Sequence, residues 1–151
     1  SLLMRFMRPV IKTIVRQKSL SEILFKNAAN PNFIKKVLKV AYPSQQNIDQ
    51  ELIDILFAPS QRNGAPEAFR GFINLFNDHL ATDLLDNLEI PVFLIWGEKD
   101  PWEPIKEAQK WFETFECVKS LEVIPNAGHC PQDEMPEKVN PIIKKIIQEA
   151  I

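Results

Sequence analysis

Apolar residues recur at helical spacing through the first half of the chain. In residues 30–43, NPNFIKKVLKVAYP, they fall three and four positions apart, which places them on one face of a helix. Asn30 is the predicted N-cap and Pro31 the first helical residue. Residues 47–59, NIDQELIDILFAP, and 64–76, GAPEAFRGFINLF, repeat this pattern. The sequence therefore predicts short amphipathic helices that are separated by proline and asparagine.

The pattern changes near residue 90. Residues 91–97, PVFLIWG, form a continuous apolar run, which is typical of a strand buried on both faces in a parallel sheet. A helical pattern follows, then a second short strand at 121–124, LEVI, and a closing helix that we expect to be interrupted at Pro141. This order of strand, helix, strand, helix predicts the α/β class.

Two strands do not make a stable sheet. Both faces need a cover, and both outer edges expose unpaired backbone groups. The helical first half could cover one face, but the strands still need neighbours. We therefore expect the remaining strands to be missing from this chain, or to come from a partner chain that completes the sheet.

The first 18 residues, SLLMRFMRPVIKTIVRQK, combine a helical apolar stripe with five basic side chains. Such a segment fits an organelle-targeting or membrane-surface helix. It also fits a solvated helix that packs on a core, which we favour because long basic side chains cover apolar flanks. The chain begins at Ser1, already inside this pattern, so we expect the beginning to be cut.

Composition excludes several classes of function. A net charge of −2 with 25% charged residues gives no electrostatic basis for nucleic-acid binding. No apolar stretch approaches the roughly 20 residues that a membrane-spanning helix needs. Cys117 and Cys130 do not form a disulfide framework, which favours a reducing compartment.

Two candidate reactive groups follow the two predicted strands. Asp100 comes after the first strand and His129 after the second. In parallel sheets, loops from the carboxyl ends of separate strands converge, so these side chains are expected to meet. A carboxylate there orients an imidazole and stabilises its cation.

Each residue has a simpler interpretation. Asp100 could be a helix N-cap, but Pro104 would then stand where the first intrahelical N–H is needed. A helix that starts at Pro104 is easier to form and leaves the Asp100 side chain free. His129 could be an ordinary loop histidine, although the tight turn PNAGH directly after a strand favours function. The other histidine, His79, is interpreted as a surface or junction residue.

Neighbouring residues offer weaker alternatives. The stretch HCPQDE, 129–134, contains possible metal ligands, but its spacing matches no common zinc pattern, so no metal site is predicted. Cys130 is interpreted as a small, partly buried residue and not as a nucleophile. Trp102 is a candidate substrate-binding wall of the pocket above the loops, with plain packing as the alternative.

With these motifs in hand, the chain resembles the C-terminal half of an α/β-hydrolase, closest to the plant and cyanobacterial chlorophyll dephytylase and pheophytinase-like group. The resemblance rests on IPVFLIWGEKDPWEP, 90–104, and VIPNAGHCPQDEMPEKVNPII, 123–143. It implies a partial α/β-hydrolase fold, with a helical cap over residues 1–80 and the last strands and helices of the core over 81–151. It also implies Asp100 as triad acid, His129 as triad base and no cofactor.

The chain departs from the family in one respect. Family members place a nucleophile in a G-x-S-x-G elbow before the acid and the base. None of the four glycines frames a serine here, and the oxyanion-hole loop is absent too. Asp100 and His129 would therefore have no nucleophile to activate within these residues.

Three functions remain open. The first is a fragment of a serine-type hydrolase for carboxylic esters of lipophilic alcohols, such as phytyl esters, inactive alone. The second is a non-catalytic remnant or interaction module. The third is a dehalogenase or epoxide-hydrolase-like enzyme with an aspartate nucleophile. The resemblance implies a plastid location if the source is a plant; otherwise a cytoplasmic one is expected.

Overall fold

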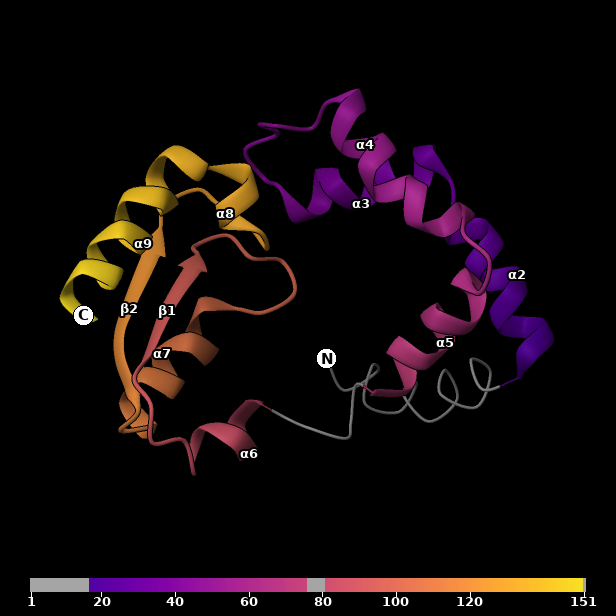
Figure 1. Ribbon diagram of the computed structural model, residues 1–151. Helices are drawn as coiled ribbons and strands as arrows, with labels where there is room; N and C mark the ends of the chain where they lie inside the picture. The colour runs from indigo at the N-terminus through magenta and orange to yellow at the C-terminus, as the bar shows by residue number, and fades with distance from the viewer. Residues whose placement is uncertain (1–16, 76–80, 151) are drawn as a thin grey trace. The chain divides into compact units, whose positions relative to one another are not determined.

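The computed structural model describes residues 17–75 and 81–150 (Figure 1). Nearly all of the basic segment at the beginning, and His79, therefore lie outside the described residues. The chain divides into two compact units, and each is treated by itself. One comprises the described parts of 1–35 and 50–80, and the other comprises 36–49 and the described part of 81–151.

The first unit is helical. Its helices are α2 (Lys18–Ala28), the beginning of α3 (Pro31–Ala41), α4 (Gln50–Phe57), the short 3-10 helix η1 (Ala58–Gln61) and α5 (Ala65–Leu75).

Local signals in the sequence set the helix boundaries of this unit. The Asn30 side chain accepts hydrogen bonds from the backbone N–H groups of Asn32 and Phe33, at 2.9 and 3.2 Å, so its predicted capping role is confirmed. Phe25 of α2 packs against Phe69 of α5 with ring centroids 5.5 Å apart. The apolar stripes thus pair the helices as expected for amphipathic segments.

The second unit is an α/β layer structure. After the chain leaves α3, it contains α6 (Ala81–Leu85), β1 (Val92–Gly97), α7 (Ile105–Thr114), β2 (Val118–Ile124), α8 (Pro131–Glu134) and α9 (Pro136–Ala150).

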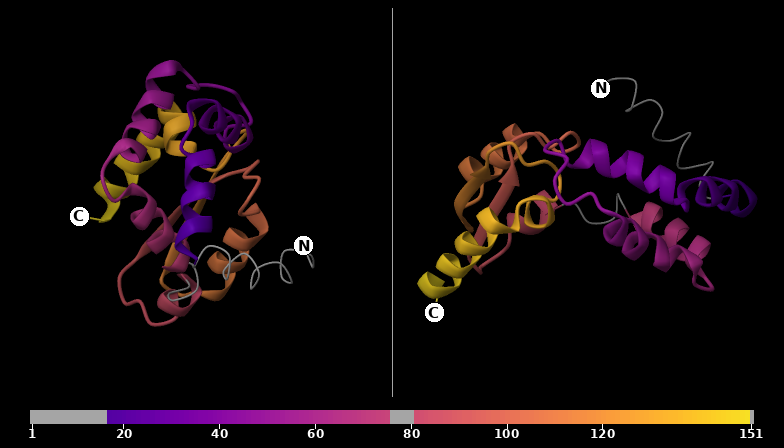
Figure 2. Two further views of the ribbon diagram at one scale, coloured as in Figure 1. Left: turned by 90° about the vertical axis from the view of Figure 1, so that its right-hand side faces the viewer. Right: turned by 90° about the horizontal axis from the view of Figure 1, so that it is seen from above.

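The two strands are parallel, with Gly97 paired to Ile124 at their carboxyl ends. Helix α9 lies on one face of the sheet and α7 on the other (Figures 1 and 2). A buried cluster of Ile124, Ala127, Met135 and Val139 joins β2 to α8 and α9. The predicted α/β class is confirmed in this unit.

Three details differ from the prediction. The second strand begins at Val118, three residues before the expected start. Strand β1 is half-buried along most of its length and not fully buried, because the sheet has no further strand beside it in the described residues. Helix α9 continues through Pro141, since burial of Val139 and packing of Ile142 on the core hold both halves in line despite one lost hydrogen bond.

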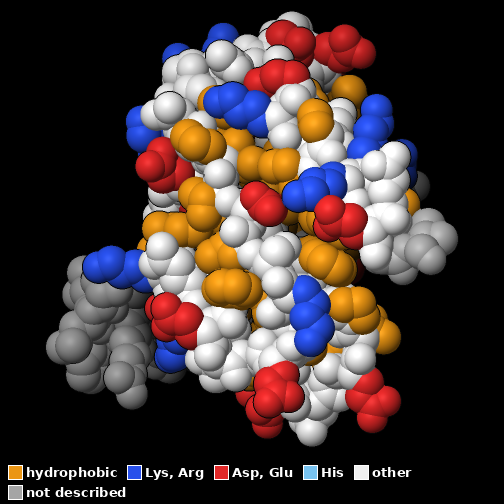
Figure 3. Space-filling model, turned by 90° about the vertical axis from the view of Figure 1, so that its left-hand side faces the viewer, with side chains coloured by type: hydrophobic (Ala, Val, Ile, Leu, Met, Phe, Trp, Pro, Cys, Tyr) orange, Lys and Arg blue, Asp and Glu red, His pale blue; other side chains and the backbone are white. Residues whose placement is uncertain are grey.

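Large apolar side chains also reach the surface, interspersed with charged ones on the face that Figure 3 shows. The most exposed in the second unit are Val40, Leu84, Ile90, Trp102, Phe112 and Ile147. Within the described residues, no helix has both the length and the apolar character to cross a bilayer.

Candidate active site

Asp100 lies in the loop between β1 and α7, where both oxygens of its carboxylate have partners. Oδ1 accepts hydrogen bonds from the backbone N–H groups of Trp102 and Glu103, at 2.9 and 3.0 Å. Helix α7 begins at Ile105, directly after Pro104, as the proline argument predicts. The expectation that this helix start leaves Asp100 free is wrong, however, because Oδ1 holds the turn before the helix.

The second oxygen of Asp100 faces the imidazole of His129. Oδ2 lies 2.9 Å from Nδ1 of His129. The Asp100 side chain is only 5% exposed, whereas that of His129 is 39% exposed. Since an ionised carboxylate accepts but cannot donate, the Nδ1 atom carries the shared proton, and Nε2 remains available on the accessible side.

Backbone hydrogen bonds bring the two loops together. Glu98 N–H donates to the carbonyl of Ile124 at 3.1 Å, and Lys99 N–H donates to that of Ala127 at 2.8 Å. In the reverse direction, Asn126 N–H donates to the Glu98 carboxylate at 2.9 Å. Asp100 and His129 therefore project from one backbone assembly, which fixes their separation.

Two glycines permit this close approach. A Cβ at Gly97 would lie 1.9 Å from the carbonyl oxygen of Gly128. A Cβ at Gly128 would lie 2.0 Å from the carbonyl oxygen of Ala41 and 2.4 Å from Pro43. Both spacings are shorter than any real contact, so only glycine fits at either position.

The surroundings favour the ionised form of Asp100. Burial by itself would raise the pKa of Asp100, but hydrogen bonds from the backbone of Glu103 and Trp102 and from His129 outweigh burial. The pKa of Asp100 therefore lies below its usual value. The acid is charged at neutral pH, as stabilisation of an imidazolium requires.

Cys130 follows His129 but does not resemble a nucleophile. Burial, with the charge of Asp133 next in size, raises the pKa of the Cys130 thiol. A thiol that keeps its proton is a poor nucleophile. The prediction that Cys130 is partly buried is confirmed.

Trp102 stands against the imidazole. The rings of Trp102 and His129 meet edge to face, with centroids 4.7 Å apart. Trp102 is 46% exposed, so a large part of its side chain remains accessible to solvent despite this contact. Its predicted role in substrate binding stays a prediction.

A small cavity opens beside the pair, with a volume of about 160 Å³. It is smaller than the ~300 Å³ at the lower end for sites that enclose a small-molecule ligand. The residues that line it are Ile95, Trp96, Gly97, Asp100, Glu103, His129, Pro131 and Gln132.

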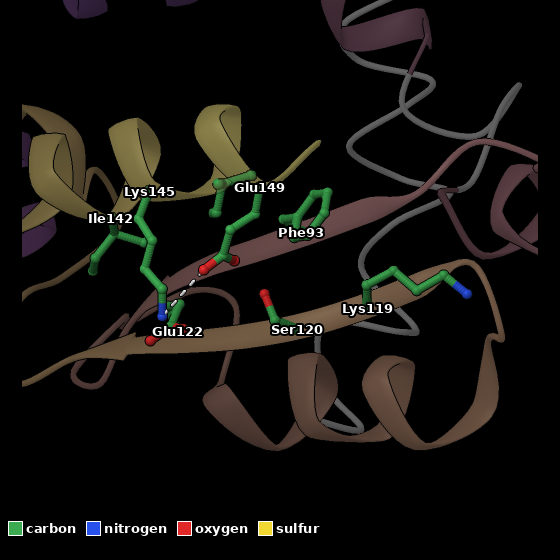
Figure 4. Close-up of a pocket in the computed structure, with 8 residues that line it drawn as sticks. Phe93, Lys119, Ser120, Glu122, Ile142, Lys145 and Glu149 are labelled. Carbon is green, nitrogen blue, oxygen red and sulfur yellow. Dashed lines mark ion pairs between the residues drawn. The ribbon is translucent and has the colours of Figure 1, made fainter. Parts of the chain in front are cut away.

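A second cavity, of about 320 Å³, lies between the sheet and α9 (Figure 4). Phe93, Ser120 and the solvent-exposed ion pair of Lys145 and Glu149 are part of its lining. It lies towards the amino ends of the strands, whereas reactive groups of parallel sheets gather at the carboxyl ends. This cavity is therefore separate from the candidate active site.

The sequence did not indicate the structural roles of three further polar residues near His129, which are Tyr42, Ser44 and Glu134. Tyr42 donates a hydrogen bond to Asp133, and Ser44 donates to the fully buried Glu134. Glu134 was considered only as a metal ligand, and no group of three or more potential metal ligands exists among the described residues. Residues 131–136, PQDEMP, are largely polar, so no local pattern in the sequence indicated a buried carboxylate.

Comparison with known proteins places this geometry in a family. The model of the alpha/beta hydrolase fold family matches residues 58–136, which include Asp100 and His129. This chain belongs to the α/β-hydrolase fold family.

Two curated relatives of this α/β-hydrolase-fold chain have different activities in their names. The chain is 29% identical over 123 residues to epoxide hydrolase 3 from Xenopus tropicalis, covering 77% of this chain and 32% of the relative. It is 27% identical over 132 residues to the chloroplastic pheophytinase of Arabidopsis thaliana, covering 83% of this chain and 26% of the relative. The chain thus spans about a quarter to a third of the length of these relatives.

Solved structures agree on the fold. A serine hydrolase involved in carbazole degradation superposes with a TM-score of 0.68 at 14% identity, covering 80% of this chain and 48% of the other. A thermophilic esterase from Thermogutta terrifontis superposes with a TM-score of 0.62 at 23% identity, covering 88% and 50% respectively. At this identity the similarity shows the fold, and a resemblance to the pheophytinase group is supported by the sequence relative.

Proposed function

We propose that Asp100 and His129 are the acid and base of a serine-type hydrolase that cleaves carboxylic esters of lipophilic alcohols. The observation that carries the proposal is the 2.9 Å contact between Asp100 Oδ2 and His129 Nδ1, with Oδ1 of the acid held by two backbone donors. Such an arrangement fixes both the orientation and the tautomer of an imidazole.

The proposed mechanism follows from that tautomer. With its proton on Nδ1, His129 presents Nε2 as a base that takes the proton of a hydroxyl nucleophile. The buried charge of Asp100 then stabilises the imidazolium. When the alcohol leaves, Nε2 returns the proton to the departing oxygen, and a water repeats the sequence to release the acid product.

The nucleophile and oxyanion donors are assigned to residues outside these 151. No G-x-S-x-G segment occurs among them, and the aligned part of the chain covers only 32% and 26% of the two relatives. By this proposal the chain is inactive alone. Serine is favoured as nucleophile because the sequence around His129 resembles the pheophytinase-like group, and because pheophytinase is among the relatives of the chain.

The substrate class rests on two supports. One is the pheophytinase relative, whose chloroplastic location also supports a plastid setting for this chain. The other is the helical cap proposed over residues 1–80, of which 36–49 belong to the second unit and the rest to the first. Leu20, Ile23, Leu24, Phe33, Ile55 and Leu56 are large apolar side chains exposed on its helices. Exposed apolar side chains of this kind are typical of surfaces that bind lipophilic groups.

The similarity to an epoxide hydrolase supports a second candidate. In this alternative an aspartate attacks carbon, and His129 activates the water that hydrolyses the resulting ester. The geometry of Asp100 and His129 serves both chemistries equally.

A non-catalytic interaction module is the third candidate. Among the described residues, each of the two strands pairs only with the other, so two outer edges have no strand partner. An extended segment of a partner chain could add to either edge.

One experiment separates these candidates. The protein from the complete open reading frame that contains this chain is assayed on p-nitrophenyl decanoate and on an aryl epoxide, and is treated with a fluorophosphonate probe. The proposal predicts ester turnover and probe labelling, both lost in His129→Ala and kept in His79→Ala. Epoxide turnover without labelling would support the aspartate nucleophile, and no turnover of either substrate would support the interaction module.

A further inference from the structure

The segment between α3 and α4, residues 42–47, is tied to α8. Asn47 Nδ2 donates to the carbonyl oxygens of Asp133 and Glu134, at 2.9 and 3.3 Å. The Tyr42 hydroxyl donates to the Asp133 carboxylate, and burial followed by this hydrogen bond raises the pKa of Tyr42 above its usual value. The phenol therefore stays a donor at physiological pH.

Glu134 occupies the centre of this contact and is fully buried, with 0% of its surface exposed. Its Oε1 accepts hydrogen bonds from the backbone N–H of Ser44, at 2.8 Å, and from the Ser44 hydroxyl. Its Oε2 accepts the backbone N–H of Gly128 at 2.6 Å. Three donors thus converge on a group that, when ionised, only accepts, which satisfies a side chain that is costly to bury.

The end of α3, directly before this segment, holds His129 from the other direction. The backbone N–H of His129 donates to the carbonyl of Ala41 at 2.9 Å. Gly128 and His129 are therefore anchored in succession, one by the carboxylate of Glu134 and the other by the end of α3. These anchors lie directly beside the residue whose ring faces Asp100.

We propose that Glu134 is a positioning residue for His129: its carboxylate bridges Ser44 and Gly128 and so keeps the imidazole aligned with Asp100. The significance of this role rests on the proposed function, since alignment matters for catalysis only if His129 is the base. A displacement of about 1 Å in a reacting group can lower a rate 10²-fold, so a buried bridge one residue away has a direct effect on the site.

A purely structural role for Glu134 makes a different prediction. It requires only that loss of the bridge lowers the stability of the unit. The positioning role requires in addition that the His129 ring changes in a chain that is still folded. The tautomer of His129 measures this difference, because the Nδ1–H form depends on a correctly placed Asp100 carboxylate.

The experiment measures imidazole ¹⁵N shifts by long-range ¹H–¹⁵N NMR at alkaline pH on the protein from the complete open reading frame that contains this chain, with His129→Ala to assign the His129 signals. Folding is followed through tryptophan fluorescence. We expect the Nδ1–H tautomer of His129 to dominate in the wild type. In Glu134→Gln the amide group presents a donor where an acceptor is needed, so the Nε2–H share should rise several-fold. Glu137→Gln, an equal charge change at an exposed position three residues later, should leave it unchanged.

An unchanged tautomer in a folded Glu134→Gln chain would overturn the positioning role. If that variant does not fold, Ser44→Ala decides. The control is Ser60→Ala, at another half-buried serine, whose hydroxyl donates to the backbone carbonyl of Phe57. A rise in the Nε2–H share in Ser44→Ala supports the proposal, and no change contradicts it. A wild-type ring without the Nδ1–H preference would contradict the Asp100–His129 pair itself, and the role of Glu134 with it.

Discussion

The carboxylate of Asp100 serves two purposes with its two oxygens. One oxygen organises the turn that precedes α7, and the other faces the imidazole. The sequence predicted the partner of Asp100 because strand ends converge in parallel sheets. The sequence did not predict the hydrogen bonds that Asp100 accepts in the turn. The position of Pro104 argues against Asp100 as a helix cap, but it says nothing about backbone N–H groups in the loop before the helix.

The hydrogen bonds to Asp100 give the stability of the second unit a defined pH dependence. In the folded state the pKa of Asp100 is lowered from 3.8. The ionised carboxylate therefore makes its full contribution to the free energy of unfolding above pH 3.8, and this contribution is lost as the pH falls through the lowered pKa. Asp100→Asn lacks this contribution. The difference in urea midpoint between wild type and Asp100→Asn should therefore be constant near neutral pH and shrink below about pH 4.

Tryptophan fluorescence is the suitable probe for this comparison. Trp96, Trp102 and Trp111 are the three tryptophans of the chain, and all belong to the second unit. The exposed Glu137→Gln variant is the control, because its midpoint should follow the wild type through the same pH range. A wild-type advantage over Asp100→Asn that persists undiminished to about pH 2 would contradict the assigned contribution.

At the scale of elements, the strand ends are joined through glycine. The order of strands and helices was predictable because apolar runs and helical stripes are local properties of the sequence. The contact of Gly128 with Ala41 was not, since it joins segments almost ninety residues apart. Likewise, continuity of α9 through Pro141 depends on core packing that only the folded unit provides.

Gly128→Ala should destabilise the second unit strongly. Its new Cβ would meet the backbone of Ala41 and the ring of Pro43, neither of which can move freely. We expect a loss of about 2 kcal/mol or more in the free energy of unfolding, measured by urea titration with tryptophan fluorescence.

Gly71→Ala provides the matched control for this change. No atom lies within 4 Å of the Cβ position at Gly71, which is in helix α5. This substitution should leave the midpoint that the tryptophans report unchanged, because Gly71 lies in the first unit and the added methyl group meets no other atom. Equal effects of the two substitutions would show that the close approach at Gly128 is not required.

At the scale of the whole molecule, the chain combines a helical unit with an α/β unit that has two strands among its described residues. The sequence predicted an incomplete sheet because two apolar strand patterns cannot satisfy their own edges. It placed the division between cap and core at residue 80. The structure assigns residues 36–49 to the second unit as well, through contacts such as Ser44 with Glu134 that no local pattern encodes.

The open strand edges predict self-association of the isolated chain. Sedimentation velocity over a range of concentrations should show species larger than the monomer, whose share rises with concentration. The same preparation should show no turnover of p-nitrophenyl decanoate, because it lacks a nucleophile elbow. A monodisperse monomer with one sharp unfolding transition would contradict the association, and turnover that His129→Ala abolishes would contradict the inactivity.

The pairing of Asp100 with His129 as acid and base is tested most directly by the kcat of the complete protein with Asp100→Asn. The isosteric amide preserves size but stabilises the wrong tautomer of the imidazole and offers no charge to its cation. We predict that kcat falls by roughly 10⁴, whereas Asp83→Asn, at an exposed position in α6, retains wild-type turnover. An Asp100→Asn enzyme with near-normal kcat would contradict the assignment and leave Asp100 as a residue that organises a turn.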